Sequence, residues 1–148
     1  MQKNSETKLI LDNLTGQFFS LFTNKEGNKL NLENIYTLFI PEGMIIKNTG
    51  AAPEINTLEQ FITPRNKILS DGTLVDFCEQ ELSERTEIFG NIAQRFSLYQ
   101  KSGILLGNRF ETKGMKTIQF IRTPDGWKIS FVAWDDERDG LAIPAEFN

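Results

Sequence analysis

The strongest constraint on the fold is a change of hydrophobic period near Thr73. Before this residue, apolar side chains recur at helical spacing, whereas after it they follow the two-residue alternation of extended strands. Four strands are predicted, over residues 74–88, 92–100, 108–122 and 127–136. Gly90-Asn91 and Thr123-Pro124-Asp125-Gly126 are turn sequences, so these strands are expected to turn back on one another as an antiparallel sheet.

Helices and one short strand are predicted ahead of this sheet. Two helices are expected over residues 8–23 and 31–40, followed by a strand over residues 44–46 and a third helix from residue 57. Asn31 is a predicted N-cap, and Pro41 ends the second helix. Thr57-Leu58-Glu59-Gln60 has the form of a capping box, and Pro64 must kink or split the helix that follows. The order ααβαββββ predicts an α+β domain, with three N-terminal helices packed on one face of a strongly bent antiparallel sheet.

Composition favours a single folded domain over residues 1–148. The chain has 39% hydrophobic residues and a net charge of −4. Lys and Arg are scattered rather than gathered in a basic stripe, so no nucleic acid partner is expected. No apolar run approaches the roughly 20 residues of a membrane span, so no membrane is expected either. The cytoplasm is therefore the default location, unless a leader was trimmed.

The absence of histidine excludes several kinds of chemistry. Serine and cysteine triads of the usual kind, His-ligated zinc or haem, and Asp-His dyads all need an imidazole. The single cysteine, Cys78, is predicted to be a small buried hydrophobe in a strand. The acidic run at residues 135–139 lacks the glycine and the alternate spacing of a calcium loop, so neither a metal site nor a cofactor is predicted.

The predicted order of elements, together with particular residues, resembles the nuclear transport factor 2-like superfamily, and within it the SnoaL-like group. These residues are Leu38-Phe39-Ile40-Pro41, Phe77-Cys78-Glu79-Gln80-Glu81, Phe89-Gly90-Asn91-Ile92-Ala93-Gln94, Phe96-Ser97, Tyr99, Lys113-Gly114, Ile118-Gln119-Phe120, Trp127, Trp134, Glu137, Ile143-Pro144 and Phe147. The resemblance implies a cone-shaped, cystatin-like α+β fold with a central pocket, and a homodimer. It does not imply one function, because this fold hosts enzymes, binding domains and assembly modules.

Three positions depart from that pattern. Look-alike sequences are expected to carry histidine at the positions of Ile40 and Gln94 and arginine at that of Lys113. Proton chemistry that relies on those histidines is therefore impossible in this chain. A carboxylate base paired with a neutral donor to an oxyanion, as in ketosteroid isomerase, stays open.

Two glutamates are the main candidates for chemistry. Glu79 and Glu81 lie two residues apart on a predicted strand, so they share a face with Phe77. They would serve as an acid/base pair, or they would simply pair with Lys and Arg of a neighbouring strand. Tyr36 lies on the apolar stripe of the second helix, where its hydroxyl would stabilise an oxyanion or be an ordinary core group.

Gln94 is the predicted polar group on the pocket floor. It alternates with Ile92, Phe96 and Leu98, so an amide on an otherwise apolar face would contact a ligand carbonyl or bond within the core. The opposite face of this strand, with Ala93, Arg95, Ser97 and Tyr99, suits a dimer interface or a wet surface.

Three hypotheses follow. The first is a homodimeric domain that binds a small, largely apolar organic molecule, with walls from Phe18, Phe22, Tyr36, Phe61, Phe77 and Trp134 and polar contacts from Glu79, Glu81 and Gln94. The second is an isomerase or lyase, in which Glu79 or Glu81 removes a proton next to a carbonyl and Tyr36 or Gln94 stabilises the enolate. The third is a dimeric protein-interaction module, which predicts a large apolar patch and no cavity.

Overall fold

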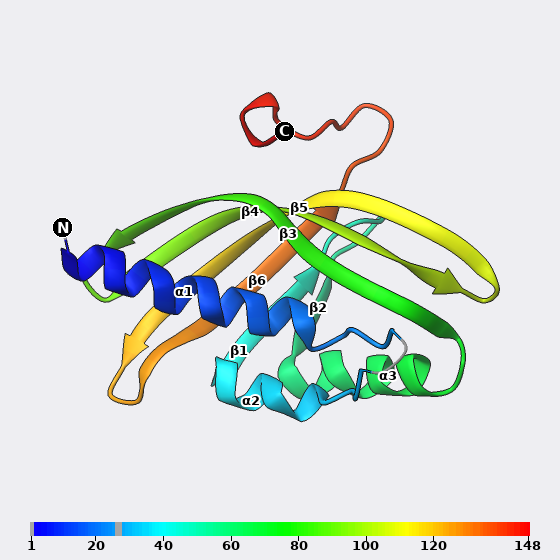
Figure 1. The fold of residues 1–148 in the computed structure, drawn as a ribbon, viewed down its shortest axis with the longest axis horizontal. Helices are drawn as coiled ribbons and strands as arrows, with labels where there is room; N and C mark the ends of the chain where they lie inside the picture. Colours follow the sequence, from blue (N-terminus) through cyan, green and yellow to red (C-terminus); the bar gives the residue numbers. More distant parts are fainter. Residues whose placement is uncertain (1, 26–27) are drawn as a thin grey trace.

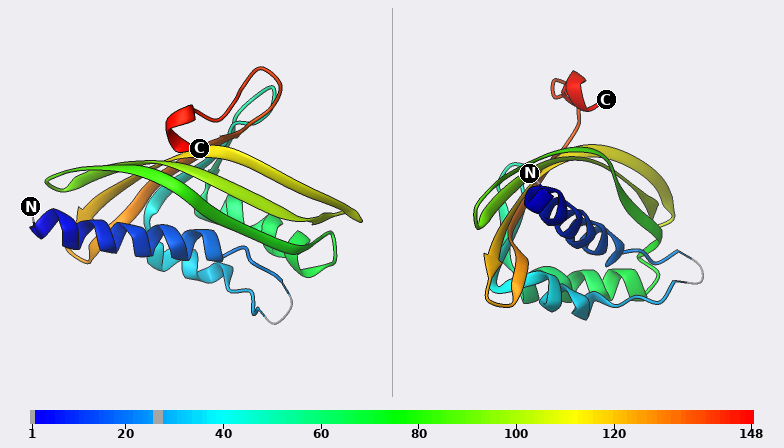
Figure 2. Two further views of the ribbon diagram at one scale, coloured as in Figure 1. Left: turned by 45° about the horizontal axis from the view of Figure 1, so that its top comes forward. Right: turned by 60° about the vertical axis from the view of Figure 1, so that its left-hand side comes forward.

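The computed structural model describes residues 2–25 and 28–148 as helices laid against one six-stranded sheet (Figure 1). The strands are β1 (Phe39–Lys47), β2 (Glu54–Thr57), β3 (Leu74–Phe89), β4 (Ile92–Leu105), β5 (Asn108–Thr123) and β6 (Gly126–Asp136), in the spatial order β2-β1-β6-β5-β4-β3. The sheet curls around helix α1 (Gln2–Ser20), with helix α3 (Leu58–Ser70) and the short helix α2 (Ile35–Leu38) on the same side (Figure 2). The predicted α+β class and order of elements are confirmed.

The sheet is mixed rather than wholly antiparallel. Neighbours from β3 to β6 pair antiparallel, as predicted, but β1 runs parallel to β6. The missed strand β2 pairs antiparallel with β1 and forms one edge of the sheet. Between β4 and β5, Leu106 and Gly107 both have positive φ, which is the conformation of a two-residue turn suited to a twisted hairpin.

Helix α1 begins earlier than its apolar stripe predicts. Leu11, Leu14 and Phe18 recur on one face at spacings of three and four, and all three are buried against the sheet. The polar residues ahead of this stripe also adopt helical structure, so the helix starts at Gln2 rather than at Lys8.

The second predicted helix is the least accurate element. Only a 3-10 turn (Leu32–Asn34) and α2 are helical, and the chain becomes extended at Phe39. Pro41 restricts Ile40 to extended backbone, so the helix ends earlier and Pro41 itself lies in β1. Asn31 occupies the N-cap position but makes no side-chain hydrogen bond there.

The capping box of α3 is confirmed. The backbone N–H of Gln60 donates to Oγ1 of Thr57 at 3.2 Å, and the backbone N–H of Thr57 donates to Oε1 of Gln60 at 3.0 Å. Pro64 lies inside this helix, which continues to Ser70 without being split.

The last residues cover the convex face of the sheet. Beyond β6 the chain turns back over this face (Figure 1). The ring of Phe147 packs edge-on against Phe96, at a centroid distance of 5.2 Å. Ser83 donates a hydrogen bond to the backbone carbonyl of Phe147 at 2.7 Å, which fixes this segment to β3. Across the described residues, no helix combines the length and the apolar character that a membrane span requires.

Candidate functional site

A cavity of about 360 Å³ lies between helices α1 and α3 and the concave face of the sheet. Its lining is mostly aromatic and aliphatic, with a few charged groups among the apolar walls. The lining residues are Phe18, Phe22, Lys47, Phe61, Pro64, Arg65, Ile68, Leu69, Leu74, Phe77, Glu79, Lys101, Leu105, Phe110, Lys116 and Trp134. This volume lies within the range that small organic ligands occupy in proteins.

The aromatic walls form a chain of edge-to-face contacts. Phe18 meets Phe22 at a centroid distance of 5.8 Å, Phe22 meets Phe61 at 5.7 Å, and Phe61 meets Trp134 at 5.7 Å. This geometry is favourable for aromatic pairs, so the walls hold their shape without a ligand. Together with Phe77, these are the predicted wall residues other than Tyr36, and they do line one cavity. Their role in binding stays a prediction.

A buried ion pair forms the polar part of the cavity wall. Nζ of Lys116 lies 3.0 Å from Oε2 of Glu79, and the two side chains are only 3% and 8% exposed. The same ammonium lies over the rings of Tyr99 at 4.2 Å and Trp134 at 4.3 Å. Burial lowers the pKa of Lys116, whereas the Glu79 carboxylate and the aromatic rings favour its charged form.

The Tyr99 ring, which contacts the Lys116 ammonium, is itself held in position by a polar contact. Its hydroxyl donates to the carboxylate of Asp136, and Nζ of Lys101 lies 3.1 Å from the same carboxylate. Burial, followed by the hydrogen bond to Asp136, raises the pKa of Tyr99. Gly114 is required beside this ring, because a Cβ atom there would overlap the Tyr99 hydroxyl and the backbone carbonyl of Asp135.

Two further cations line the cavity without a carboxylate partner. The guanidinium of Arg65 lies 3.6 Å above the ring of Phe61, and its Nη1 donates to the backbone carbonyl of Phe61 at 3.2 Å. Burial lowers the pKa of Arg65 to about 10. Lys47, from the end of β1, is also half-buried. Within the described ranges, no carboxylate lies within ion-pair distance of either cation.

Glu81 belongs to a different set of contacts from Glu79. Its carboxylate accepts from Nε of Arg95 at 3.0 Å, from Nη2 of Arg95 at 2.5 Å and from Ser97 at 2.6 Å. Arg95 also binds Asp12 of α1 at 2.7 Å. Although burial alone would lower the pKa of Arg95, hydrogen bonds to Glu81 and Asp12 raise it. Glu81 therefore fastens α1 to the sheet and does not line the apolar cavity. The two glutamates do line a separate hollow beside α1, so their role as an acid/base pair stays a prediction.

The predicted faces of β4 are reversed. Arg95, Ser97 and Tyr99 point toward the helices and are buried, so they form neither a dimer interface nor a wet surface. Gln94 is exposed on the convex face, where its amide donates to Glu87 at 2.7 Å. The placement of Gln94 on the pocket floor is therefore wrong, since it is absent from the cavity lining.

Tyr36 does not reach the cavity either. It lies on α2 with 47% of its surface exposed, because the buried face of this helix carries Ile35 and Leu38 instead. The structure thus provides no oxyanion donor from Tyr36 beside Glu79.

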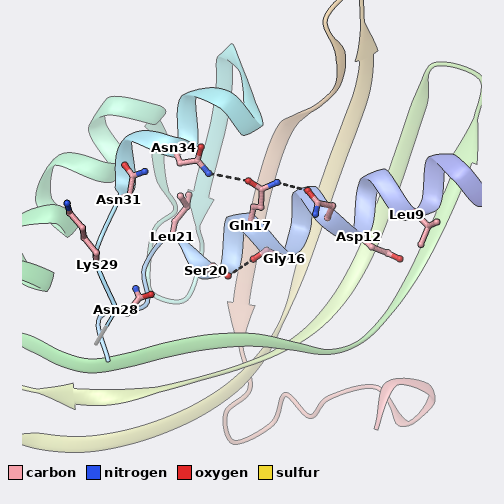
Figure 3. A pocket seen from close by; sticks show the side chains of 11 residues that line it. Leu9, Asp12, Gly16, Gln17, Ser20, Leu21, Asn28, Lys29, Asn31 and Asn34 are labelled. Carbon is pink, nitrogen blue, oxygen red and sulfur yellow. Dashed lines mark hydrogen bonds between the residues drawn. The ribbon is translucent and has the colours of Figure 1, made fainter. Parts of the chain in front are cut away.

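A second hollow is an open groove along the outer side of α1 (Figure 3). Several of its polar groups are hydrogen-bonded to one another or to the helix backbone: Gln17 donates to Asn13 at 2.5 Å, Asn34 donates to Gln17 at 3.3 Å, and Ser20 donates to the backbone carbonyl of Gly16 at 2.9 Å (Figure 3). We therefore place the candidate site in the apolar cavity. In the described part of the chain, no group of three or more His, Cys, Asp or Glu side chains is arranged to hold a metal ion.

Lys116 and Arg65 are the functional candidates that sequence reasoning missed. Lys116 is in phase with Ile118 and Phe120, which are buried, so the two-residue alternation already placed it on the inner face. Arg65 lies four residues after Phe61 on the same side of α3, the spacing at which helical side chains meet. Both signals were present in the sequence, but charged residues are more often read as solvent-exposed.

Several solved structures resemble this one closely in fold. Hexachlorocyclohexane dehydrochlorinase LinA-type3 from Novosphingobium barchaimii LL02 matches with a TM-score of 0.74 and 13% identity, over 91% of this chain and 89% of that one. A nuclear transport factor 2-like superfamily protein from Salmonella enterica serovar Typhimurium matches with a TM-score of 0.68 and 15% identity, over 90% and 94% of the two chains. An NTF2-like protein of unknown function from Silicibacter pomeroyi DSS-3 matches with a TM-score of 0.61 and 13% identity, over 90% and 98%.

At these identities the likeness shows the fold alone. No protein-family model matches the sequence, and no curated protein matches it.

Proposed function

We propose that this chain, which has the fold of the nuclear transport factor 2-like proteins, binds a small organic molecule with a largely apolar body in the cavity beneath its sheet. The observation that carries the proposal is the cavity of about 360 Å³ walled by edge-to-face aromatic rings. Binding of an apolar ligand in such a site is favourable, because the ligand leaves water and the walls that it contacts are already ordered.

A neutral fluorescent probe tests this proposal. N-phenyl-1-naphthylamine, whose emission rises in apolar surroundings, is titrated into the purified full chain. We expect saturable binding with a stoichiometry of one, which the variant Ile68→Trp abolishes because its larger ring fills the cavity that Ile68 lines. Ile55→Trp is the matched control, since Ile55 is exposed on β2 and does not line the cavity. Absence of saturable binding, or equal binding by both variants, would contradict the proposal.

The Glu79–Lys116 pair supports a second candidate function, an isomerase or lyase reaction. The Glu79 carboxylate would take the proton from a carbon next to a carbonyl, so that the C–H electron pair forms the C=C bond of the enolate and the C=O π electron pair moves onto the oxygen. The Lys116 ammonium, 3.0 Å from Glu79, would then stabilise the enolate in place of Tyr36 or Gln94. The dehydrochlorinase among the structural neighbours is an example of an enzyme on this fold.

Isotope exchange tests the second candidate. The α protons of 1-phenylpropan-2-one are followed by proton NMR in D₂O, with and without protein. Catalysed exchange that falls by about 10²-fold or more in Glu79→Gln is the expected result. Equal exchange by the wild type and the variant would leave binding as the sole proposed function.

The interaction-module hypothesis is less well supported. It predicts a domain without a cavity, whereas the space between helices and sheet is open. A homodimer is compatible with a ligand pocket and stays a prediction.

A further inference from the structure

We infer that the cavity selects organic anions, with the apolar body held by the aromatic walls and the anionic head group held by Arg65 and Lys47. This inference rests on the proposed ligand-binding function and names the class of ligand.

The first argument is the balance of charge around the cavity. Four cations and one carboxylate line it, although the whole chain has a net charge of −4. Two of the cations are neutralised by the protein itself, because Lys116 pairs with Glu79 at 3.0 Å and Lys101 pairs with Asp136 at 3.1 Å. The positive charge that is left belongs to Arg65 and Lys47.

The second argument is the state of Arg65. Its guanidinium is stacked on Phe61 and fixed by a hydrogen bond to the backbone of α3, so it loses little further freedom when it binds a ligand. Only one hydrogen bond is made by its side chain within the described residues, which leaves donors free for anionic oxygens. The nearest acids, Glu54 on the exposed strand β2 and Glu79 in the cavity wall, act on it only through space. Arg65 is therefore a fixed cation for which the described residues provide no carboxylate at ion-pair distance.

The third argument is that Lys47 comes to the same cavity from another element. It is the last residue of β1, and its register partner on β6 is Trp134, which also lines the cavity. A head group bound here would thus be held by a helix residue and a strand residue. Charge-assisted hydrogen bonds to such groups are stronger than neutral ones, particularly where apolar walls exclude water.

A matched pair of probes separates this inference from the proposed function. N-phenyl-1-naphthylamine is neutral, and 1-anilinonaphthalene-8-sulfonate is the same ring system with one negative charge. We expect the anionic probe to bind the wild-type protein at least about tenfold more tightly than the neutral one. This preference should decrease as salt is added, because screening weakens partly exposed charges.

Variants locate the preference. In the double variant Lys47→Met and Arg65→Met, the ratio of the affinity for the anionic probe to the affinity for the neutral probe should fall about tenfold or more. Neither cation forms an ion pair within the described residues, so the double variant leaves no carboxylate without its partner. Lys67→Met is the control, since Lys67 is an exposed cation of the same helix that does not line the cavity.

The outcomes are distinct. Equal affinity of the two probes for the wild type, or a preference that survives in the double variant, would overturn the inference and leave the pocket intact. Failure of both probes to bind would overturn the proposed function together with the inference.

Discussion

The ammonium of Lys116 lies 3.0 Å from the carboxylate of Glu79, and neither side chain has appreciable contact with water. Two charges withdrawn from water are costly, and each is tolerated only because the other is present. Lys116 gains further from the rings of Tyr99 and Trp134. The pair places a positive and a negative group, both held in position, at the surface of an apolar cavity.

A double-mutant cycle measures this dependence. Glu79→Met alone removes the counter-charge of a buried ammonium, and we expect it to lower the free energy of unfolding by about 3 kcal/mol or more. Replacing both partners, as Glu79→Met with Lys116→Met, should cost only about 1 kcal/mol, because no charge is left buried and unpaired. Urea unfolding of the single and double variants provides the values. Additive losses in the double variant would contradict the pairing.

Stability should decrease in acid through the contacts between α1 and the sheet. Although burial alone would raise the pKa of Asp12, hydrogen bonds from Lys8 and Arg95 hold it below its ordinary value of 3.8. A carboxylate with a lowered pKa stabilises the fold at neutral pH, and this contribution is lost as the pH falls below about 4 toward the lowered pKa.

Asp12→Asn tests that assignment. Because the amide does not titrate, the variant should lose less stability than the wild type when urea unfolding at about pH 7 is compared with about pH 3. The control is Asp125→Asn, at an exposed turn residue. An unchanged acid dependence in Asp12→Asn would assign the effect to other carboxylates.

Asn24 is expected to be one of the most sensitive polar positions. Its side-chain amide donates to the backbone carbonyls of Leu69 at 3.0 Å and Leu74 at 2.7 Å, and its Oδ1 accepts from the backbone N–H of Phe77 at 2.7 Å. It thus joins the end of α1 to α3 and to the start of β3, at the edge of the cavity. Asn24→Ala should cost about 2–3 kcal/mol in urea unfolding, because three partly buried backbone groups lose their partner.

Asn31→Ala is the matched control for that experiment. Asn31 makes no side-chain cap hydrogen bond, so its replacement should change stability by less than about 0.5 kcal/mol. Similar losses at the two positions would contradict the structural role of Asn24.

The strands were predictable because their signals are local. Alternating apolar residues and the turn sequences after Phe89 and Thr123 locate β3, β5 and β6 to within one residue, whereas β4 continues to Leu105, beyond its predicted end at residue 100. The strand β2 was missed because Glu54–Thr57 is exposed and has no apolar alternation, so only its pairing with β1 makes it a strand. Parallel pairing of β1 with β6 depends on contacts between residues about 90 positions apart, which no local pattern reports.

The candidate site was predictable only in part. Phe77 and Glu79 share the inner face, as their spacing predicts, but the register shift between Glu81 and Ser83 shows how a bulge changes which side chains meet. The face of β4 was assigned from polarity, which placed Gln94 inside and Arg95 outside. The reverse holds, because Glu81 and Asp12 neutralise Arg95 and make its burial possible.

The homodimer remains a prediction, and substitutions on the convex face of the sheet can test it. Phe89 and Ile92 are 83% and 58% exposed and face each other as register partners at the end of the β3–β4 hairpin. We expect a dimer by light scattering, which Phe89→Ser with Ile92→Ser converts to a monomer because apolar area no longer leaves water on association. Leu9→Ser, at an exposed position on α1, is the control. A wild-type monomer, or a dimer in the double variant, would contradict this prediction.

The most direct test of the central claim is an NMR titration of the ¹⁵N-labelled full chain with N-phenyl-1-naphthylamine. The account predicts saturable amide shifts that cluster around the cavity, at Phe61, Phe77 and Lys116, with little change at Phe89 and Gln94 on the convex face. Shifts confined to the convex face, or no saturable shifts at all, would contradict a ligand pocket between the helices and the sheet.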